Sequence, residues 1–118
     1  MTDAERCRSY ADRLIEPLRA AAKEHGYALA VHGSLARDID LIAAPWVPEA
    51  SLAPVLAEAI RAKAEEVVGY AFLAPHEHRE FPRRKPHGRL CWAFHLGGGP
   101  YIDLAVMPTA VYMEGMLK

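Results

Sequence analysis

The chain has 118 residues and a formal net charge of −1, which predicts one domain and argues against a general nucleic-acid coat protein. Hydrophobic residues make up 52% of the sequence and charged residues 25%, a balance that excludes wholesale disorder. No apolar run approaches the length of a membrane span and the N-terminus is charged rather than signal-like, so we expect a cytoplasmic protein without a membrane partner.

The chain is expected to begin with a long helix. Thr2 is a candidate N-cap, followed by acidic residues in the first turn. Apolar residues recur at helical spacing from Cys7 to Ala22 and predict one buried stripe. Pro17 lies inside this pattern and predicts a kink or a break into two segments. Gly26 is the expected C-terminal cap.

Two strands and a second helix are predicted next. Residues 27–32 and 38–44 are rich in apolar side chains and predict two strands, antiparallel to each other across a tight connection. Ser51 is the expected N-cap of a second helix, which ends near residue 68. Gly69 is expected to close this helix.

The second half of the chain predicts a further hairpin. Residues 70–75 are compatible with a short strand or with a helix-to-loop transition. Residues 76–88 are basic and contain two prolines, which predicts a loop. Residues 89–96 and 101–107 alternate and predict two strands, and residues 109–117 predict a short terminal helix.

The alternation in this hairpin also predicts its register. Its apolar faces coincide only if the numbers of opposed residues have an even sum. The residues expected on the core face are Leu90, Trp92, Phe94, Leu96, Ile102, Leu104 and Val106. Asp103 then lies on the opposite face, as a carboxylate isolated in an apolar strand.

Asp38 and Asp40 are separated by one residue at the start of an apolar run. In a strand, the period of two puts both carboxylates on one face. Two like charges so close repel each other, and a cation makes such a pair tolerable. The preceding Gly33 has no Cβ, so a phosphate can approach its backbone and that of Ser34 closely. A phosphate cradle beside paired carboxylates is typical of phosphoryl or nucleotidyl transfer.

Gly33-Ser34 followed by Asp38-Ile39-Asp40-Leu41 resembles the signature of the DNA polymerase beta-like nucleotidyltransferase superfamily, in its minimal form. Only three residues separate the two parts, too few for the short helix that the family normally has there. The resemblance implies that Asp38, Asp40 and Asp103 are catalytic and hold Mg²⁺ or Mn²⁺. It also implies that Gly33 and Ser34 handle the phosphates of a nucleoside triphosphate. The implied function is nucleotidyl transfer to an acceptor hydroxyl on a nucleic acid, a protein or a small molecule.

The basic segment adds candidate phosphate contacts and leaves other functions open. Lys85 and Arg89 are expected to neutralise phosphates. One alternative is a non-catalytic nucleotide- or partner-binding module with the same fold. Another is a small nucleic-acid-binding protein that uses residues 76–89, with Trp46 and Tyr101 as stacking partners. A zinc site is a third alternative, but the spacing of its candidate ligands matches no standard arrangement: His76, His78, His87 and His95.

Together these patterns predict one α+β domain over residues 1–118. We expect a small mixed or antiparallel four-stranded sheet with helices on one face, nucleotidyltransferase-like in its arrangement. The opposite face carries the three aspartates, which requires strands 38–44 and 101–107 to be close neighbours in one sheet.

Overall fold

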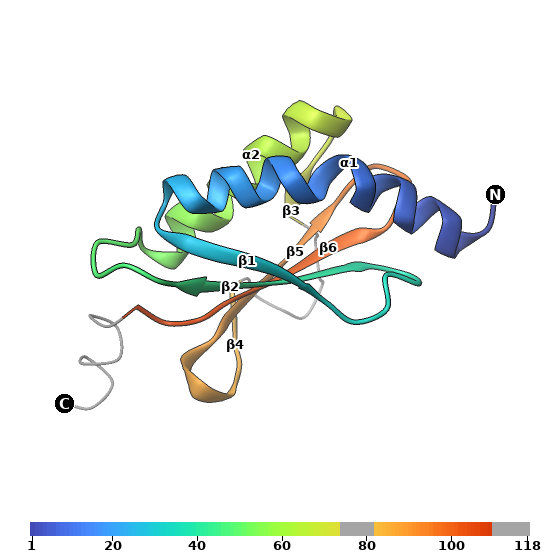
Figure 1. Cartoon of the computed structure of the whole chain (residues 1–118). Coiled ribbons are helices and arrows are strands. Elements are labelled where there is room, and N and C mark those ends of the chain that lie inside the picture. Colours follow the sequence, from blue (N-terminus) through green and yellow to red (C-terminus); the bar gives the residue numbers. More distant parts are fainter. Residues whose placement is uncertain (74–81, 110–118) are drawn as a thin grey trace.

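The computed structural model of the chain, which describes residues 1–73 and 82–109, is an α+β domain in which two helices cover one face of a mixed sheet (Figure 1). The elements in chain order are α1 (Asp3–Glu24), β1 (Tyr27–His32), β2 (Ile39–Pro45), α2 (Ala53–Val68), β3 (Phe72–Leu73), β4 (Arg83–Arg84), the 3₁₀ turn η1 (Pro86–Gly88), β5 (Leu90–His95) and β6 (Tyr101–Val106). The part of the chain so described contains no helix long and apolar enough to cross a membrane. The terminal helix expected at residues 109–117 lies almost entirely outside the described residues.

Within residues 1–73 and 82–109 the sheet contains six strands, not the four expected. Its order is β1-β2-β6-β5-β3, and β4 pairs separately with β5. The four expected strands are all present. The first addition is β3, which shows that residues 72–73 adopt the strand alternative for their segment. The second is β4, so Arg83–Arg84 is not loop as expected, because its backbone pairs antiparallel with Cys91 and Leu90 of β5.

The predicted pairings are confirmed. β1 and β2 are antiparallel, and β5 and β6 form an antiparallel hairpin in which Trp92 lies opposite Leu104, an even sum. β2 and β6 are direct neighbours, as the candidate site required. Their pairing is the parallel one, and it makes the sheet mixed.

Helix α1 forms as one uninterrupted element. The Thr2 hydroxyl oxygen accepts a hydrogen bond from the Glu5 backbone N–H at 3.1 Å, which confirms the expected N-cap. No break occurs at Pro17, because Leu14 and Leu18 on either side are both fully buried in the same core and hold the two halves in line. The helix ends at Glu24, and the expected Gly26 follows the cap residue with φ +84°.

The expected cap of α2 is wrong. The N-cap position is Leu52, which makes no side-chain cap hydrogen bond. The Ser51 hydroxyl lies instead 2.9 Å from His25 Nδ1, and the Ser51 carbonyl accepts from the Tyr27 hydroxyl at 2.6 Å. Ser51 therefore ties the start of α2 to the end of α1. At the other end of α2, Gly69 adopts the left-handed conformation of a C-cap, as predicted.

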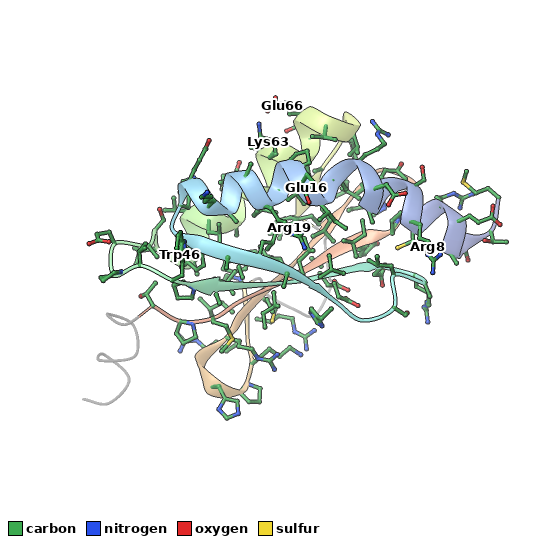
Figure 2. All side chains as sticks on the ribbon, viewed as in Figure 1. Arg8, Glu16, Arg19, Trp46, Lys63 and Glu66 are labelled. Carbon is green, nitrogen blue, oxygen red and sulfur yellow. The ribbon has the colours of Figure 1, made fainter. Side chains whose placement is uncertain are left out.

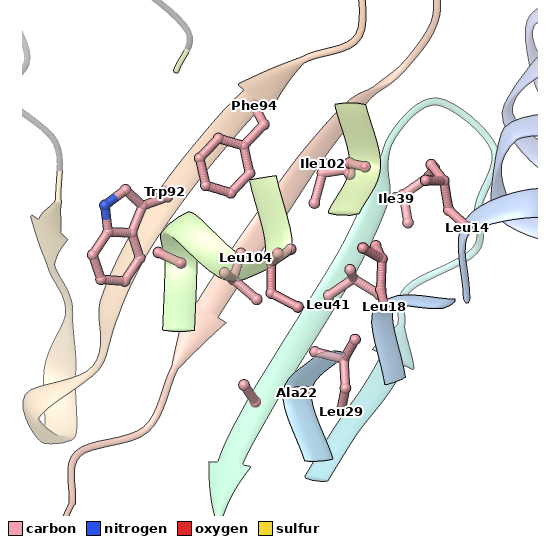
Figure 3. Close-up of a cluster of buried hydrophobic side chains, with 14 of the residues drawn as sticks. Leu14, Leu18, Ala22, Leu29, Ile39, Leu41, Trp92, Phe94, Ile102 and Leu104 are labelled. Carbon is pink, nitrogen blue, oxygen red and sulfur yellow. The ribbon is translucent and has the colours of Figure 1, made fainter. Parts of the chain in front are cut away.

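The hydrophobic core lies between the helices and one face of the sheet (Figure 3). Its central residues come from α1 and from three neighbouring strands: Leu14, Leu18, Ile39, Leu41, Trp92, Phe94, Ile102 and Leu104. Burial of each such side chain contributes about 1.5–3 kcal/mol. The outer surfaces of the helices carry charged pairs such as Lys63 and Glu66 (Figure 2). Since the core uses one set of alternate strand residues, the other set points to the face of the sheet away from the helices.

Candidate functional site

The structure brings the three expected carboxylates together on the face of the sheet away from the helices. Asp40 of β2 and Asp103 of β6 are direct partners across the parallel pair, so their side chains emerge side by side. Asp38 comes just before β2 and is two residues from Asp40, so its side chain lies on the same face as that of Asp40. Its Oδ1 accepts a hydrogen bond from the Tyr101 backbone N–H at 3.1 Å. This bond anchors the start of β2 to the start of β6.

The pKa of Asp103 is raised by burial and by the neighbouring negative charges. Burial, the charges of Asp38 and Asp40, and a hydrogen bond with Asp40 together raise the pKa of Asp103 to about 6. On the helix side, the pKa of the Cys7 thiol is also raised, first by burial and then by the charges of Asp38 and Asp40. The site is thus one in which a bound cation relieves repulsion.

The chemistry of the donor set fits Mg²⁺ or Mn²⁺ only in part. Within residues 1–73 and 82–109, no group of three or more His, Cys, Asp or Glu side chains is placed to hold a metal ion. His87 and His95, two candidate ligands of the zinc alternative, are among these residues and belong to no such group. His76 and His78 lie outside the described residues. Mg²⁺, however, is usually held by one or two carboxylates together with substrate phosphates and water. The neighbouring Asp40 and Asp103 could supply such a pair of oxygen ligands.

An open pocket of about 530 Å³ lies over these carboxylates. It is lined by the three aspartates, by three cationic residues and by other residues of the same face, among them Asp38, Asp40, Asp103, Arg83, Lys85, Arg89, His32, Cys91 and Tyr101. The two expected phosphate contacts, Lys85 and Arg89, therefore share a pocket with the carboxylates. The turn between β4 and β5 positions them, and it projects from the face away from the helices (Figure 1). The Lys85 N–H donates to the Arg89 carbonyl at 2.9 Å across this turn.

The pocket also contains residues that were not among the sequence-derived site residues, and His32 and Cys91 are two of them. His32 is the β1 partner of Asp40, and its side chain lines the pocket beside the carboxylates. Cys91 lies on β5 opposite Arg83, and burial raises the pKa of its thiol. Cys91 is two residues from Arg89 in an alternating sequence. Because residues two apart in a strand share a face, this spacing indicates that both lie on the outer face.

The expected phosphate contacts at Gly33 and Ser34 lie in a different place from Lys85 and Arg89. Ser34 lines a separate depression of about 350 Å³, together with Asp38 and Asp40. The Ser34 hydroxyl oxygen accepts from the Ala36 N–H at 3.3 Å. Asp38 and Asp40 thus border both hollows, one beside the Gly-Ser loop and one beneath the basic turn, whereas Asp103 borders only the second.

The loop from β1 to β2 is short and strained. It contains no helix, as the three-residue spacing predicted. Gly33 has φ +77°, and a Cβ at this position would lie 2.8 Å from Asp40 Oδ2. Leu35 has φ +57°, which costs a residue with a side chain about 1–3 kcal/mol. Its side chain packs against the hydrophobic core, and this packing holds the loop close to the carboxylates.

The proposed stacking pair of Trp46 and Tyr101 is not brought together. Tyr101 lies beside Asp38, at the start of β2. Trp46 follows the other end of β2. There its backbone N–H donates to the Gly26 carbonyl at 3.0 Å, and its side chain is exposed (Figure 2).

The chain matches no protein-family model, no curated protein and no solved structure. Paired carboxylates in a pocket bordered by cationic side chains suit a polyanionic substrate, and such carboxylates could also hold a divalent cation.

Proposed function

We propose that this protein is a metal-dependent nucleotidyltransferase that moves a nucleotidyl group from a nucleoside triphosphate to an acceptor hydroxyl. The observation that carries the proposal is the side-by-side placement of Asp40 and Asp103 on parallel strands, within one pocket that also contains Lys85 and Arg89. The resemblance of Gly33-Ser34 and Asp38-Ile39-Asp40-Leu41 to the nucleotidyltransferase signature supports the same chemistry. A nucleotidyltransferase-like fold is part of this proposal.

Each group has a role that follows from its position. Bound Mg²⁺ or Mn²⁺ would neutralise phosphate oxygens and stabilise the charge that develops during transfer. Asp40 and Asp103 would hold the ion, and Asp38 borders both hollows and adds to the negative field. Lys85 and Arg89 would contact phosphate oxygens, as would the backbone at Gly33-Ser34 from the other hollow.

The transfer needs no reagent other than the nucleoside triphosphate and the acceptor hydroxyl. The acceptor oxygen forms a bond to the α-phosphorus, and the bond from that phosphorus to the bridging oxygen breaks. Pyrophosphate leaves with the electron pair of the broken bond. The acceptor proton passes to Asp103 or to solvent.

A non-catalytic nucleotide- or partner-binding module is the second candidate. The observation that favours it is the lack of a three-ligand metal group in residues 1–73 and 82–109. Such a module would keep the pocket and its phosphate contacts but produce no turnover.

One assay separates the two candidates. The protein is incubated with each labelled triphosphate, Mg²⁺ or Mn²⁺, and a panel of nucleic-acid, protein and small-molecule acceptors, and pyrophosphate is measured. We expect pyrophosphate from the wild type and none from a folded Asp103→Asn variant. Nucleotide binding without pyrophosphate under any condition would establish the binding module instead.

A further inference from the structure

A second group of side chains occupies the sheet face that carries the carboxylates. Four neighbouring rings lie together on this face, and we call them the aromatic row: Tyr70, Phe72, His95 and Tyr101. Tyr70 lies near both Phe72 and His95, with its ring centroid 6.3 Å from that of His95. The ring centroids are 5.0 Å apart for Tyr70 and Phe72, and 5.1 Å apart for Phe72 and His95. Those of His95 and Tyr101 are 4.9 Å apart.

The strand pairing places this row next to the candidate site. Tyr101 of β6 is the partner of His95 of β5, which in turn is the partner of Phe72 of β3. The row therefore crosses three neighbouring strands. Tyr101 is the member of the row that lies next to the carboxylates. Its backbone N–H donates a hydrogen bond to Asp38, and Tyr101 lines the carboxylate pocket.

Support of the sheet alone does not explain the row. Cross-strand aromatic pairs do stabilise sheets. The core of this domain, however, lies on the other face, where Phe94 and Trp92 are buried. Phe72 and His95 are only half-buried, and Tyr70 is 47% exposed. Rings left partly in water beside a polar pocket are available to stack with a planar ligand.

We propose that the aromatic row stacks the bases of a single-stranded nucleic acid, whose terminal hydroxyl lies at the carboxylates and is the acceptor. The acceptor role rests on the proposed function. A free triphosphate has one base, which would use one ring, whereas this row offers rings on three successive strands. Stacking of unpaired bases on aromatic residues of an open sheet face, with helices behind it, is an established way to bind single strands.

The charge distribution supports the same direction of binding. Along β5, His95 of the row pairs with Tyr101, Ala93 pairs with Asp103, and Cys91 pairs with Arg83. The row and the cationic end of the pocket therefore lie on opposite sides of Asp103, and the cationic side chains suit the triphosphate. The order along the face is then bases of the acceptor, carboxylates, and phosphates of the donor. This is the order in which the reacting groups must meet.

Phe72→Leu is the sharpest test of the row, since leucine keeps the apolar character and removes the aromatic face. His95 is less suitable, because its Nδ1 accepts the Gly97 N–H at 2.8 Å and supports the following turn. Leu73→Ala is the matched control, since Leu73 is also exposed but alternates to the other face. Binding is measured by fluorescence anisotropy with short labelled single-stranded DNA and RNA, and with the same strands made abasic.

We expect Phe72→Leu and the abasic strands each to raise Kd about tenfold, while Leu73→Ala leaves it unchanged. Equal affinity for abasic and base-containing strands would overturn the row as a stacking site, as would wild-type affinity in Phe72→Leu. Extension of the bound strand is then measured with triphosphate and Mg²⁺. Base-dependent binding with no pyrophosphate from any acceptor would refute the transferase and leave the row intact. Pyrophosphate formed with other acceptors only would refute the bound strand as the acceptor and leave the transferase intact.

Discussion

Asp40 and Asp103 are direct partners on the parallel strands β2 and β6, and both are half-buried in the lining of one pocket. Two carboxylates in this relationship cannot both be ionised without cost. The arrangement therefore has consequences for stability, for metal binding and for the response to substitution.

The first prediction concerns pH. The pKa of Asp103 is about 6 in the folded protein against an ordinary 3.8, because of burial and the two neighbouring carboxylates. Between these values the folded protein binds more protons than the unfolded chain, so the free energy of unfolding falls as pH rises through this window. Asp103→Asn lacks this effect. We expect its stability relative to wild type to increase from about pH 4 to above pH 6 in a chelator-containing buffer, as measured by urea denaturation. A difference that does not change with pH would contradict the assignment.

The second prediction concerns metal. Mg²⁺ or Mn²⁺ should raise the melting temperature, and more so with a triphosphate present, because both bind selectively to the folded state. Asp40→Asn should remain folded and lose this response. Asp12→Asn, on the exposed surface of α1, is the matched control and should respond like the wild type. Identical metal responses of the Asp40→Asn variant and the wild type would eliminate the proposed ion site.

The third prediction separates pocket cations from surface cations. Lys85→Gln should weaken triphosphate binding about tenfold at low salt, because a charge-assisted contact to phosphate is lost. Lys85 is preferred to Arg89, whose Nε donates to the Pro86 carbonyl at 3.3 Å and supports the turn. Arg84→Gln on the adjacent strand is the control, since Arg84 does not line the pocket. The measurement is anisotropy of a labelled triphosphate, and equal affinities of the two variants would show that the basic turn does not contact phosphate.

The fourth prediction compares two glycines. Gly33 and Gly69 have φ +77° and +90°, so an alanine at either position costs about 1–2 kcal/mol of backbone strain. A Cβ at Gly33 would also lie 2.8 Å from Asp40 Oδ2, whereas a Cβ at Gly69 meets nothing within 4 Å. We therefore expect both variants to lose similar stability in urea, but only Gly33→Ala to lose the metal response. Retention of that response in Gly33→Ala would show that the loop does not position Asp40.

Much of the local structure could be predicted because it depends on residues close in sequence. The alternation of apolar residues in β5 and β6 sets which side chains share a face, so the register and the outward placement of Asp103 followed from the pattern alone. The N-cap at Thr2 and the C-cap at Gly69 are equally local. Ser51 was predicted wrongly, because His25 and Tyr27, which are distant in sequence, engage its hydroxyl and carbonyl.

The sequence by itself determined that Asp38 and Asp40 point to the same face and that Asp103 points away from the core. It also determined that each strand has a core side and an open side. Only the tertiary structure decided that β2 and β6 pair in parallel, which sets Asp40 against Asp103. It also decided that Lys85 joins them in one pocket while Ser34 borders another. Strand faces follow from the fixed geometry of consecutive peptide units, whereas strand order follows from which edges meet when distant segments bury their apolar faces together.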